Sequence, residues 1–320
     1  MALKRKPAAP SPAIATAEII SLRANGKPCR RTDYLAREEP LEIRVRGKSV
    51  AITMRTPGYD AELAAGFLVS EGLIRKRAEI VEIAHCQQGE AALHGNVLNV
   101  FMAPSVSIDF ERLTRHVFAS SSCGLCGKAS IEAVQQHFPP VTSKVRISTK
   151  TLTSLPGKLR AEQEAFDQTG GLHAAALFDA KGKMLVLRED VGRHNAVDKV
   201  IGHAFMRGLL PLEKQVLLVS GRASFEILQK ALAARIPIIA AVSAPSSLAV
   251  EFAQENGQTL VGFLRGNAMN VYAHPERIHA RAAAMPNISQ PQTMQAVSDS
   301  RLNGTEPNEP KRNKKGNLCN

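Results

Sequence analysis

The sequence predicts an α/β fold in which helices cover a layered sheet, preceded by a smaller N-terminal α+β region and flanked by disordered tails. In the second half of the chain, short runs rich in β-branched residues alternate with amphipathic helical segments, which is typical of α/β sheets. In the first half, strand-like segments surround one helical stretch. Both chain ends are rich in Pro, Asn, Gln and Ser and lack apolar periodicity, which indicates disorder.

The first region contains a hairpin, a helix and two further strands. Apolar and polar residues alternate on both sides of Gly47-Lys48, which predicts a β-hairpin with one dry face. Asp60 is placed to cap a helix with Leu63, Phe67 and Ile74 on its apolar face. The predicted strands are the hairpin at 41–55 and the segments 79–84 and 97–102.

The second region alternates strands and helices more regularly. A turn at Lys181-Gly182 joins the first two strands into a hairpin. The predicted strands are 172–179, 184–187, 215–219, 236–242 and 259–264. The predicted helices are 158–168, 193–207, 224–235 and 246–255. The expected organisation is a basic tail (1–15), an α+β region (16–120), a loop, helix and linker (121–150), an α/β domain (151–285) and a second tail (286–320).

The net charge of +12 is shared between the tails and the body of the chain. Residues 1–15 carry +3 and residues 286–320 carry +2, which leaves +7 for residues 16–285. The basic run Lys311 to Lys315 reads as a solvated tail rather than a nucleic-acid arm. A body of +7 suggests an anionic ligand or partner, but the charge total does not choose between them.

Composition excludes several classes of protein. No apolar run approaches the roughly 18–20 residues of a membrane helix. The basic start has no apolar segment of the kind that secretory signals carry. Five cysteines in 320 residues are too few for a disulfide framework, and an odd count fits a reducing compartment. We therefore expect a cytoplasmic protein that does not enter the membrane.

One pair of cysteines, Cys123 and Cys126, carries the sharpest chemical signal. Two residues separate the thiols, so they can share a disulfide, a metal or a sulfur atom. The segment 129–138 has helical periodicity, which places both thiols at or just before a helix N-terminus, where the dipole lowers a thiol pKa. Lys128 adds positive charge nearby. A reactive thiolate is the preferred interpretation.

Other interpretations of this pair are weaker. A structural zinc site needs four ligands, and the remaining cysteines (Cys29, Cys86 and Cys319) are isolated. No structural metal is therefore predicted. A thioredoxin-type dithiol follows the first strand of a βαβ unit, which is not the layout here. A buried structural pair remains possible, although the surrounding glycines and serines favour an exposed loop.

Three further segments place polar residues where a strand ends, which is where ligands bind in α/β sheets. The first groups an acid, bases, an imidazole and an amide around Arg193, His194 and Asn195; helix capping alone could explain part of this polarity. The second follows the strand at 215–219 and suits an anion, or an ordinary capped turn; its candidates are Ser220, Gly221 and Arg222. The third closes the last strand, and its candidates are Phe263, Leu264, Arg265, Gly266, Asn267 and Ala268.

Six segments, in this order, resemble the formate dehydrogenase accessory sulfurtransferase family, also called FdhD/NarQ. They are TPGYDAELAAGFLVSEGLI, SSSCGLCGK, EDVGRHNAVDKVIG, SGRASFEI, the Ala244-Pro245-Ser246 turn and FLRGNAMNVY. The resemblance covers roughly residues 16–282 and leaves out both tails. Several long motifs in one order are far more specific than a lone pair of cysteines.

The resemblance implies a sulfurtransferase. Members of this family take persulfide sulfur from a cysteine desulfurase and pass it to the molybdenum bis(molybdopterin guanine dinucleotide) cofactor, which formate dehydrogenase then receives. By motif position, Cys123 is expected to carry the persulfide, Cys126 to assist, and the segment from Phe263 to Ala268 to bind the cofactor. The family also implies a homodimer and a three-layer core similar to cytidine deaminases. The helix starts at 192–195 and 220–224 lack the cysteines of a deaminase zinc site.

Two rival functions remain open at this stage. A dithiol oxidoreductase would use Cys123 and Cys126 equally and cycle between dithiol and disulfide. A nucleic-acid-binding protein would explain the charge, but three Tyr and no Trp offer few stacking platforms. We therefore expect an anionic cofactor, and no nucleic acid, as the ligand of the basic body.

Overall fold

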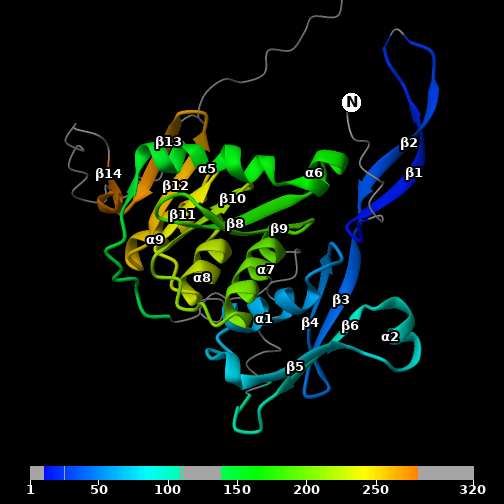
Figure 1. The fold of residues 1–320 in the computed structure, drawn as a ribbon, viewed down its shortest axis with the longest axis horizontal. Coiled ribbons are helices and arrows are strands. Elements are labelled where there is room, and N and C mark those ends of the chain that lie inside the picture. Colours follow the sequence, from blue (N-terminus) through cyan, green and yellow to red (C-terminus); the bar gives the residue numbers. More distant parts are fainter. Residues whose placement is uncertain (1–10, 25, 109, 111–137, 280–320) are drawn as a thin grey trace, which may run out of the picture. The chain divides into compact units, whose positions relative to one another are not determined.

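The computed structural model describes residues 11–24, 26–108, 110 and 138–279. Its larger sheet has six strands in the order β13-β12-β11-β10-β8-β9 (Figure 1). The parallel strands β10, β11 and β12 form its centre, and β8 and β13 flank them in antiparallel pairing. The strands are β8 (His173–Asp179), β9 (Met184–Asp190), β10 (Gln215–Val219), β11 (Ile238–Ala241), β12 (Thr259–Arg265) and β13 (Ala268–Ala273).

Helices cover both faces of this sheet. Successive residues of a strand point to opposite faces: Leu217 packs in the core beneath α7 (Arg193–Met206), α8 (Phe225–Ala233) and α9 (Ser247–Glu255), whereas Leu218 packs in a separate core beneath α5 (Thr149–Ala161). Both residues are fully buried. The predicted α/β class with a three-layer core is confirmed.

The N-terminal region forms a second, four-stranded sheet in the order β4-β3-β6-β5. One face of this sheet, which carries Leu41 and Ile43, packs against Leu63 and Leu68 of α1 (Asp60–Ser70), and these residues belong to the same core as α7 and α8. The region therefore shares its hydrophobic core with the α/β layers. Its strands are β3 (Glu39–Val45), β4 (Lys48–Arg55), β5 (Ile80–His85) and β6 (Val97–Met102).

Two glycines allow α1 and α7 to cross at close range. A Cβ atom on Gly66 of α1 would lie 1.8 Å from the carbonyl oxygen of Asp198, and one on Gly202 of α7 would lie 1.8 Å from the carbonyl oxygen of Glu62. Neither backbone leaves room for any side chain at these points. The crossing fixes the start of α7, and hence its motif, against the N-terminal region.

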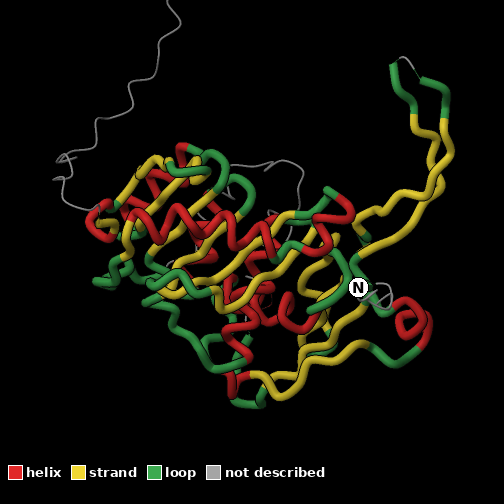
Figure 2. Tube along the Cα trace, turned by 45° about the horizontal axis from the view of Figure 1, so that its top comes forward, coloured by secondary structure: helices red, strands yellow, loops and turns green. Residues whose placement is uncertain are grey.

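A two-stranded hairpin, which was not predicted from the sequence, projects away from the two larger sheets (Figures 1 and 2). It consists of β1 (Ile14–Ser21) and β2 (Cys29–Ala36), paired antiparallel from Ile14–Ala36 to Ser21–Cys29. We call β1 and β2 the arm. Its first strand begins inside the segment 1–15 that was predicted as a tail.

Helix boundaries differ most from the prediction at two places, and α7, α8 and α9 differ from it by only one or two residues at an end. The helix predicted at 158–168 is two helices: α5 starts at Thr149, where the Ser148 hydroxyl accepts a hydrogen bond from the Thr151 amide, and α6 (Glu164–Thr169) follows a break at Gln163. Helix α1 ends at Ser70, because Gly72 turns the chain with a positive φ of 72°. Ile74 is therefore buried beyond the helix rather than on its face.

The remaining elements are short. They are η1 (Arg77–Glu79), α2 (Gly89–His94), β7 (Ile147–Ser148), η3 (Pro275–Arg277) and β14 (Ile278–His279). Among the helices of the described residues, none has the length and apolar character required to cross a bilayer.

Candidate functional site

Three helices begin at one edge of the larger sheet. Strands β10, β11 and β12 end there, and α7, α8 and α9 start from the same edge after Gly192, Ser224 and Ser246. Within the described residues, no side chain caps α7 at Gly192 or α8 at Ser224. Helix N-termini carry a partial positive charge and free amide groups, so this edge suits an anion.

Basic side chains gather around Gly221 at this edge. A Cβ on Gly221 would lie 3.3 Å from Nδ1 of His173 and 3.8 Å from Cδ of Arg193, so the glycine lets both side chains approach its backbone closely. Burial lowers the pKa of His173, and the charges of Arg193, His194 and Arg222 lower it further. We call His173, Arg193, His194 and Arg222 the strand-end cluster. The guanidinium groups of Arg193 and Arg222 supply positive charge that fits an anionic group.

Ser220 and His194 are oriented by neighbouring polar groups. The Ser220 hydroxyl accepts a hydrogen bond from the Ala174 amide at 2.9 Å, and the Ser220 amide donates to the Ala174 carbonyl at 2.9 Å. Nε2 of His194 lies 3.2 Å from the Ser224 hydroxyl and 3.5 Å from the Glu226 carboxylate. The hydrogen bond with His194 lowers the pKa of Glu226 to about 2, so Glu226 is an anion beside the His194 ring.

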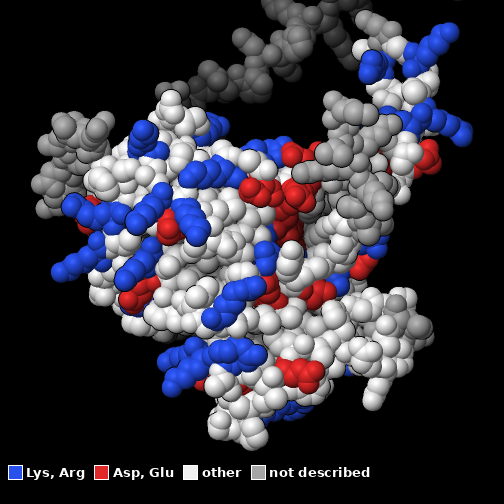
Figure 3. All heavy atoms as spheres, in the orientation of Figure 1, with Lys and Arg blue, Asp and Glu red and all other residues white. Residues whose placement is uncertain are grey.

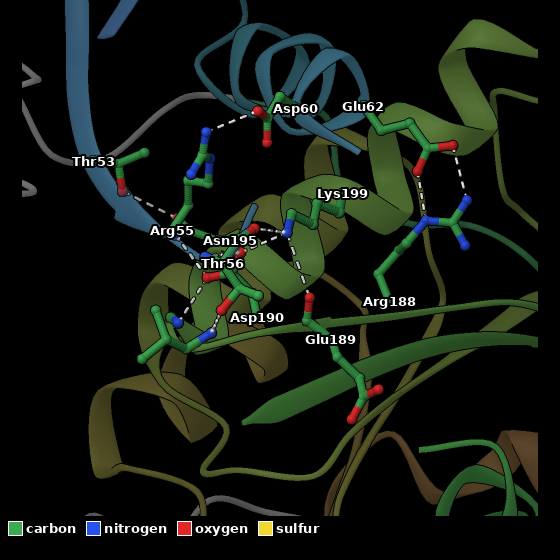
Figure 4. A network of polar contacts seen from close by, with 12 residues as sticks. Thr53, Arg55, Thr56, Asp60, Glu62, Arg188, Glu189, Asp190, Asn195 and Lys199 are labelled. Carbon is green, nitrogen blue, oxygen red and sulfur yellow. Dashed lines mark hydrogen bonds and ion pairs between the residues drawn. The ribbon is translucent and has the colours of Figure 1, made fainter. Parts of the chain in front are cut away.

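Asn195 belongs to a structural network instead (Figure 4). Its amide nitrogen donates to Oδ1 of Asp190 at 3.0 Å and to the Met54 carbonyl at 2.8 Å. The same Asp190 forms an ion pair with Lys199 at 2.6 Å, and both side chains are buried. The Thr56 amide donates a hydrogen bond to the Asp190 carboxylate, and the Thr56 hydroxyl accepts one from the Val191 amide. The network ties the loop before α7 to the end of β4.

The hairpin between β12 and β13 lies at the same edge of the larger sheet as the strand-end cluster. Arg265, Gly266, Asn267 and Ala268 are exposed, whereas Leu264 is fully buried in the core beneath α5. Phe263 has a positive φ of 51°, and the Arg265 guanidinium lies 5.6 Å from the centre of its ring. The structure thus presents Arg265 and Asn267 to solvent at the strand end.

The turn at residues 243–246 connects the start of α8 to the β12–β13 hairpin through backbone hydrogen bonds. The Phe263 amide donates to the Ser243 carbonyl at 3.0 Å, and the Ala223 amide donates to the Ala244 carbonyl at 3.2 Å. The Ser246 amide returns a hydrogen bond to the Ala223 carbonyl at 3.0 Å. Residues 243–246 therefore contact both the start of α8 and the end of β12.

The sequence of the chain matches one protein family. A model of the FdhD/NarQ family covers residues 36–279, which is most of the chain and all of the strand-end segments. The chain belongs to the FdhD/NarQ family.

Named relatives and a solved structure agree with this FdhD/NarQ assignment. The sulfur carrier protein FdhD of Streptomyces avermitilis is 56% identical over 274 residues, covering 83% of this chain and 96% of that protein. The sulfur carrier protein FdhD of Mycobacterium tuberculosis is 54% identical over 255 residues, covering 78% and 92%. A crystal structure of a formate dehydrogenase accessory protein from Desulfotalea psychrophila superposes with a TM-score of 0.66 at 27% identity, covering 84% of this chain and all of that one.

Cys123 and Cys126 lie outside the described residues, as does most of the segment 129–138 that was predicted as a helix. Of the described cysteines, Cys29 is exposed and Cys86 is half-buried, and both are free thiols. Among the described residues, no group of three or more His, Cys, Asp or Glu side chains is arranged to hold a metal ion. The roles of Cys123 and Cys126 therefore stay predictions.

The sequence did not point to His173, because nothing around it resembles a motif. The residue starts β8 after Gly170-Gly171, and it reaches the edge only because β8 runs antiparallel to β10. Thr56 and Lys199 were also missed as partners of Asp190. Lys199 appears in the sequence as an ordinary helix lysine, and only the packing of α7 against β4 shows that it is buried.

Proposed function

We propose that this protein is a sulfur carrier for formate dehydrogenase: it accepts sulfur as a cysteine persulfide and passes it to the molybdenum bis(molybdopterin guanine dinucleotide) cofactor. The observation that carries this proposal is its membership of FdhD/NarQ, with relatives named sulfur carrier proteins at 44–56% identity over most of the chain. The solved relative is described as a formate dehydrogenase accessory protein, which agrees with the proposed recipient.

Cys123 is proposed as the carrier. Its thiolate attacks the terminal sulfur of a donor persulfide, the donor S–S bond breaks, and the donor cysteine leaves as a thiolate. In the second step the terminal sulfur leaves Cys123 as a neutral atom and Cys123 keeps the electron pair of the broken bond. The acceptor molybdenum then supplies the electron pair of the new bond. Cys126 is proposed to assist.

The strand-end edge is proposed to bind the cofactor, which is the cargo of the reaction. Its guanosine diphosphate parts carry phosphates, and the strand-end cluster, the amides at the starts of α7 and α8, and Arg265 supply matching positive charge. The Ala174 amide orients the Ser220 hydroxyl, and Gly221 lets the side chains of His173 and Arg193 lie close to the strand end. Phe263 and Asn267 offer an aromatic ring and an amide for a base.

The proposed partners follow from this chemistry. A cysteine desulfurase supplies the persulfide, a formate dehydrogenase receives the completed cofactor, and the carrier acts as a homodimer in the cytoplasm.

The test is to load the purified protein with a cysteine desulfurase and cysteine and to locate the added sulfur by peptide mass spectrometry. The sulfur is expected on Cys123. Cys123→Ala should lose both the adduct and the activation of formate dehydrogenase, whereas Cys29→Ala, a change at an exposed cysteine of the arm, should keep both. A Cys123→Ala variant that still carries sulfur and still activates the enzyme would refute the assignment.

A second measurement separates sulfur transfer from dithiol chemistry. A dithiol oxidoreductase loses all activity when Cys126 is replaced, because the disulfide cannot form. A persulfide carrier keeps its sulfur adduct on Cys123 in the Cys126→Ala variant. Retention of the adduct supports the proposal, and its complete loss together with a Cys123–Cys126 disulfide in the wild type contradicts it.

A further inference from the structure

The arm is a two-stranded ribbon with large apolar side chains in solvent. Its root is anchored where Ile14 packs with Ala165 of α6 and Leu172. Farther out, Ile20 is 61% exposed and Tyr34 is 50% exposed. An isolated two-stranded hairpin is only marginally stable in water, so an arm of this kind gains from being covered.

The outer half of the arm is strongly basic. Residues 21–31 contain four bases, Arg23, Lys27, Arg30 and Arg31, and no acid, and these four side chains are exposed. Of these four, Arg31 lies 3.7 Å from the carboxylate of Asp33. Nearer the root, the carboxylate of Glu18 accepts a hydrogen bond from Thr32 at 2.7 Å. In Figure 3 the Lys and Arg side chains of this half stand clear of the rest of the surface. The tip therefore suits an acidic surface.

An acidic cavity lies at the root of the same arm. It has a volume of about 410 Å³ and is bordered by Ile14 of β1, by the α5–α6 junction and by β9. Three glutamates line it: Glu162 and Glu164, which are exposed at the rim, and Glu189, which is half-buried. Figure 3 shows acidic side chains gathered over this part of the surface, near α6.

The two bases that line the cavity are already neutralised from outside it. Arg188 binds both oxygens of Glu62, at 2.6 and 2.9 Å, and Lys199 pairs with Asp190 at 2.6 Å. Neither Glu62 nor Asp190 lines the cavity. The Glu189 carboxylate accepts hydrogen bonds from the Ala165 and Phe166 amides at 3.1 and 2.9 Å. The charge that remains toward the cavity is therefore mainly that of Glu162 and Glu164, and it is opposite to the charge of the arm tip.

We propose that two copies of this protein form a two-fold dimer in which the basic tip of each arm docks at the acidic cavity beside the root of the other arm. When two equal arms lie side by side and antiparallel, each tip reaches the other root, and the cavity is at that root. A two-fold axis makes both contacts at once. The dimer covers Ile20 and Tyr34 between the arms and joins opposite charges at both ends.

The proposed contact specifies a surface for the dimer named under the proposed function, but it does not depend on sulfur transfer. If a variant loses the dimer but still carries the sulfur adduct on Cys123, the dimer is not needed for sulfur loading, and the sulfur-carrier proposal stands. A dimer that forms by another surface would leave the sulfur chemistry unaffected.

Charge reversal on each side provides the test. The arm variant carries Arg30→Glu and Arg31→Glu, and the rim variant carries Glu162→Arg and Glu164→Arg. Each is expected to weaken the dimer at least tenfold in analytical ultracentrifugation, since like charges then face each other at both contacts. An equimolar mixture of the two variants is expected to restore dimerisation, because both contacts of the mixed dimer again join opposite charges.

Matched controls change the same charges elsewhere. Lys181→Glu with Lys183→Glu reverses two exposed lysines at the β8–β9 turn, and Glu251→Arg with Glu255→Arg reverses two exposed glutamates on α9. Both controls should dimerise as the wild type does, and circular dichroism should confirm that all variants fold. A wild type that stays monomeric at tens of micromolar, or a dimer that neither variant weakens, would overturn the proposal. So would a mixture that fails to recover.

Discussion

The ammonium group of Lys199 lies 2.6 Å from the carboxylate of Asp190, and the two side chains are 1% and 0% exposed. Lys199 also donates to the Thr56 carbonyl at 2.8 Å, while Asp190 accepts from Gly192 and Asn195. The pair joins the end of β9, the start of α7 and the end of β4. The loop that carries Arg193 and His194 is therefore held from beneath by a buried ion pair.

Removing one member of this pair should destabilise the protein strongly. In Lys199→Met the buried carboxylate of Asp190 loses its counter-charge, and the free energy of unfolding should fall by about 3–5 kcal/mol. Urea unfolding followed by circular dichroism measures this. Lys183→Met, at an exposed lysine, should change stability by less than about 0.5 kcal/mol. Equal stability of the two variants would contradict the structural role of the pair.

The crossing of α1 and α7 predicts opposite effects for the same substitution at two helical glycines. Gly202→Ala forces a Cβ to within 1.8 Å of the Glu62 carbonyl oxygen, so the helices must separate, and we expect a loss of about 1–3 kcal/mol or more. Gly157→Ala in α5 meets no atom within 4 Å and should stabilise the helix by about 0.5–1 kcal/mol. Thermal unfolding of both variants gives the comparison, and a neutral Gly202→Ala would be incompatible with the crossing.

The pair of His194 and Glu226 predicts a pH dependence. The hydrogen bond with His194 lowers the pKa of Glu226 from 4.5 to about 2, so the interaction stabilises the folded state above pH 4.5 and the benefit is lost as the pH falls toward 2. In His194→Ala the pKa of Glu226 should rise toward its ordinary value. Carbon-detected NMR of the Glu226 carboxyl group measures the shift, and His279→Ala, at an exposed histidine of β14, should leave it unchanged.

The geometry of the strand-end cluster predicts that Arg222 contributes to binding the phosphates of guanosine diphosphate (GDP). Arg222 is exposed beside Gly221, so Arg222→Ala should leave the melting temperature unchanged and weaken GDP binding about tenfold, as the loss of a charge-assisted hydrogen bond would. Isothermal titration calorimetry with GDP measures the affinity, and Lys181→Ala serves as the control. An unchanged affinity in Arg222→Ala would place the phosphate elsewhere.

Sequence patterns located most elements of the larger sheet because its central strands are buried on both faces and its helices are amphipathic. The strand predicted at 215–219 matches β10 residue for residue, and the motif around His194 lies between β9 and α7 as expected. The arm was missed because most of its side chains are exposed on both faces, which removes the regular contrast between apolar and polar positions.

Other features depend on contacts between segments that are distant in the chain. The edge position of His173 follows from strand pairing, and the burial of Lys199 follows from the packing of α7 on the N-terminal region. Leu264 and Asn195 were chosen with their neighbours as binding residues, but neighbours along a strand face opposite sides of the sheet, and neighbours along a helix point in different directions around its axis. The side chain of Leu264 lies in the core, and that of Asn195 lies in the network around Asp190.

The arrangement of β10, β11 and β12 has a consequence for the size of the ligand. The cluster around Gly221 follows β10 and the hairpin with Arg265 follows β12, with β11 between them. Two interstrand spacings amount to roughly 10 Å. The spacing of the strands thus selects for ligand size. A single phosphate can bind only at one of these two sites, and only a ligand with two separated recognition groups can contact both the cluster around Gly221 and the hairpin with Arg265.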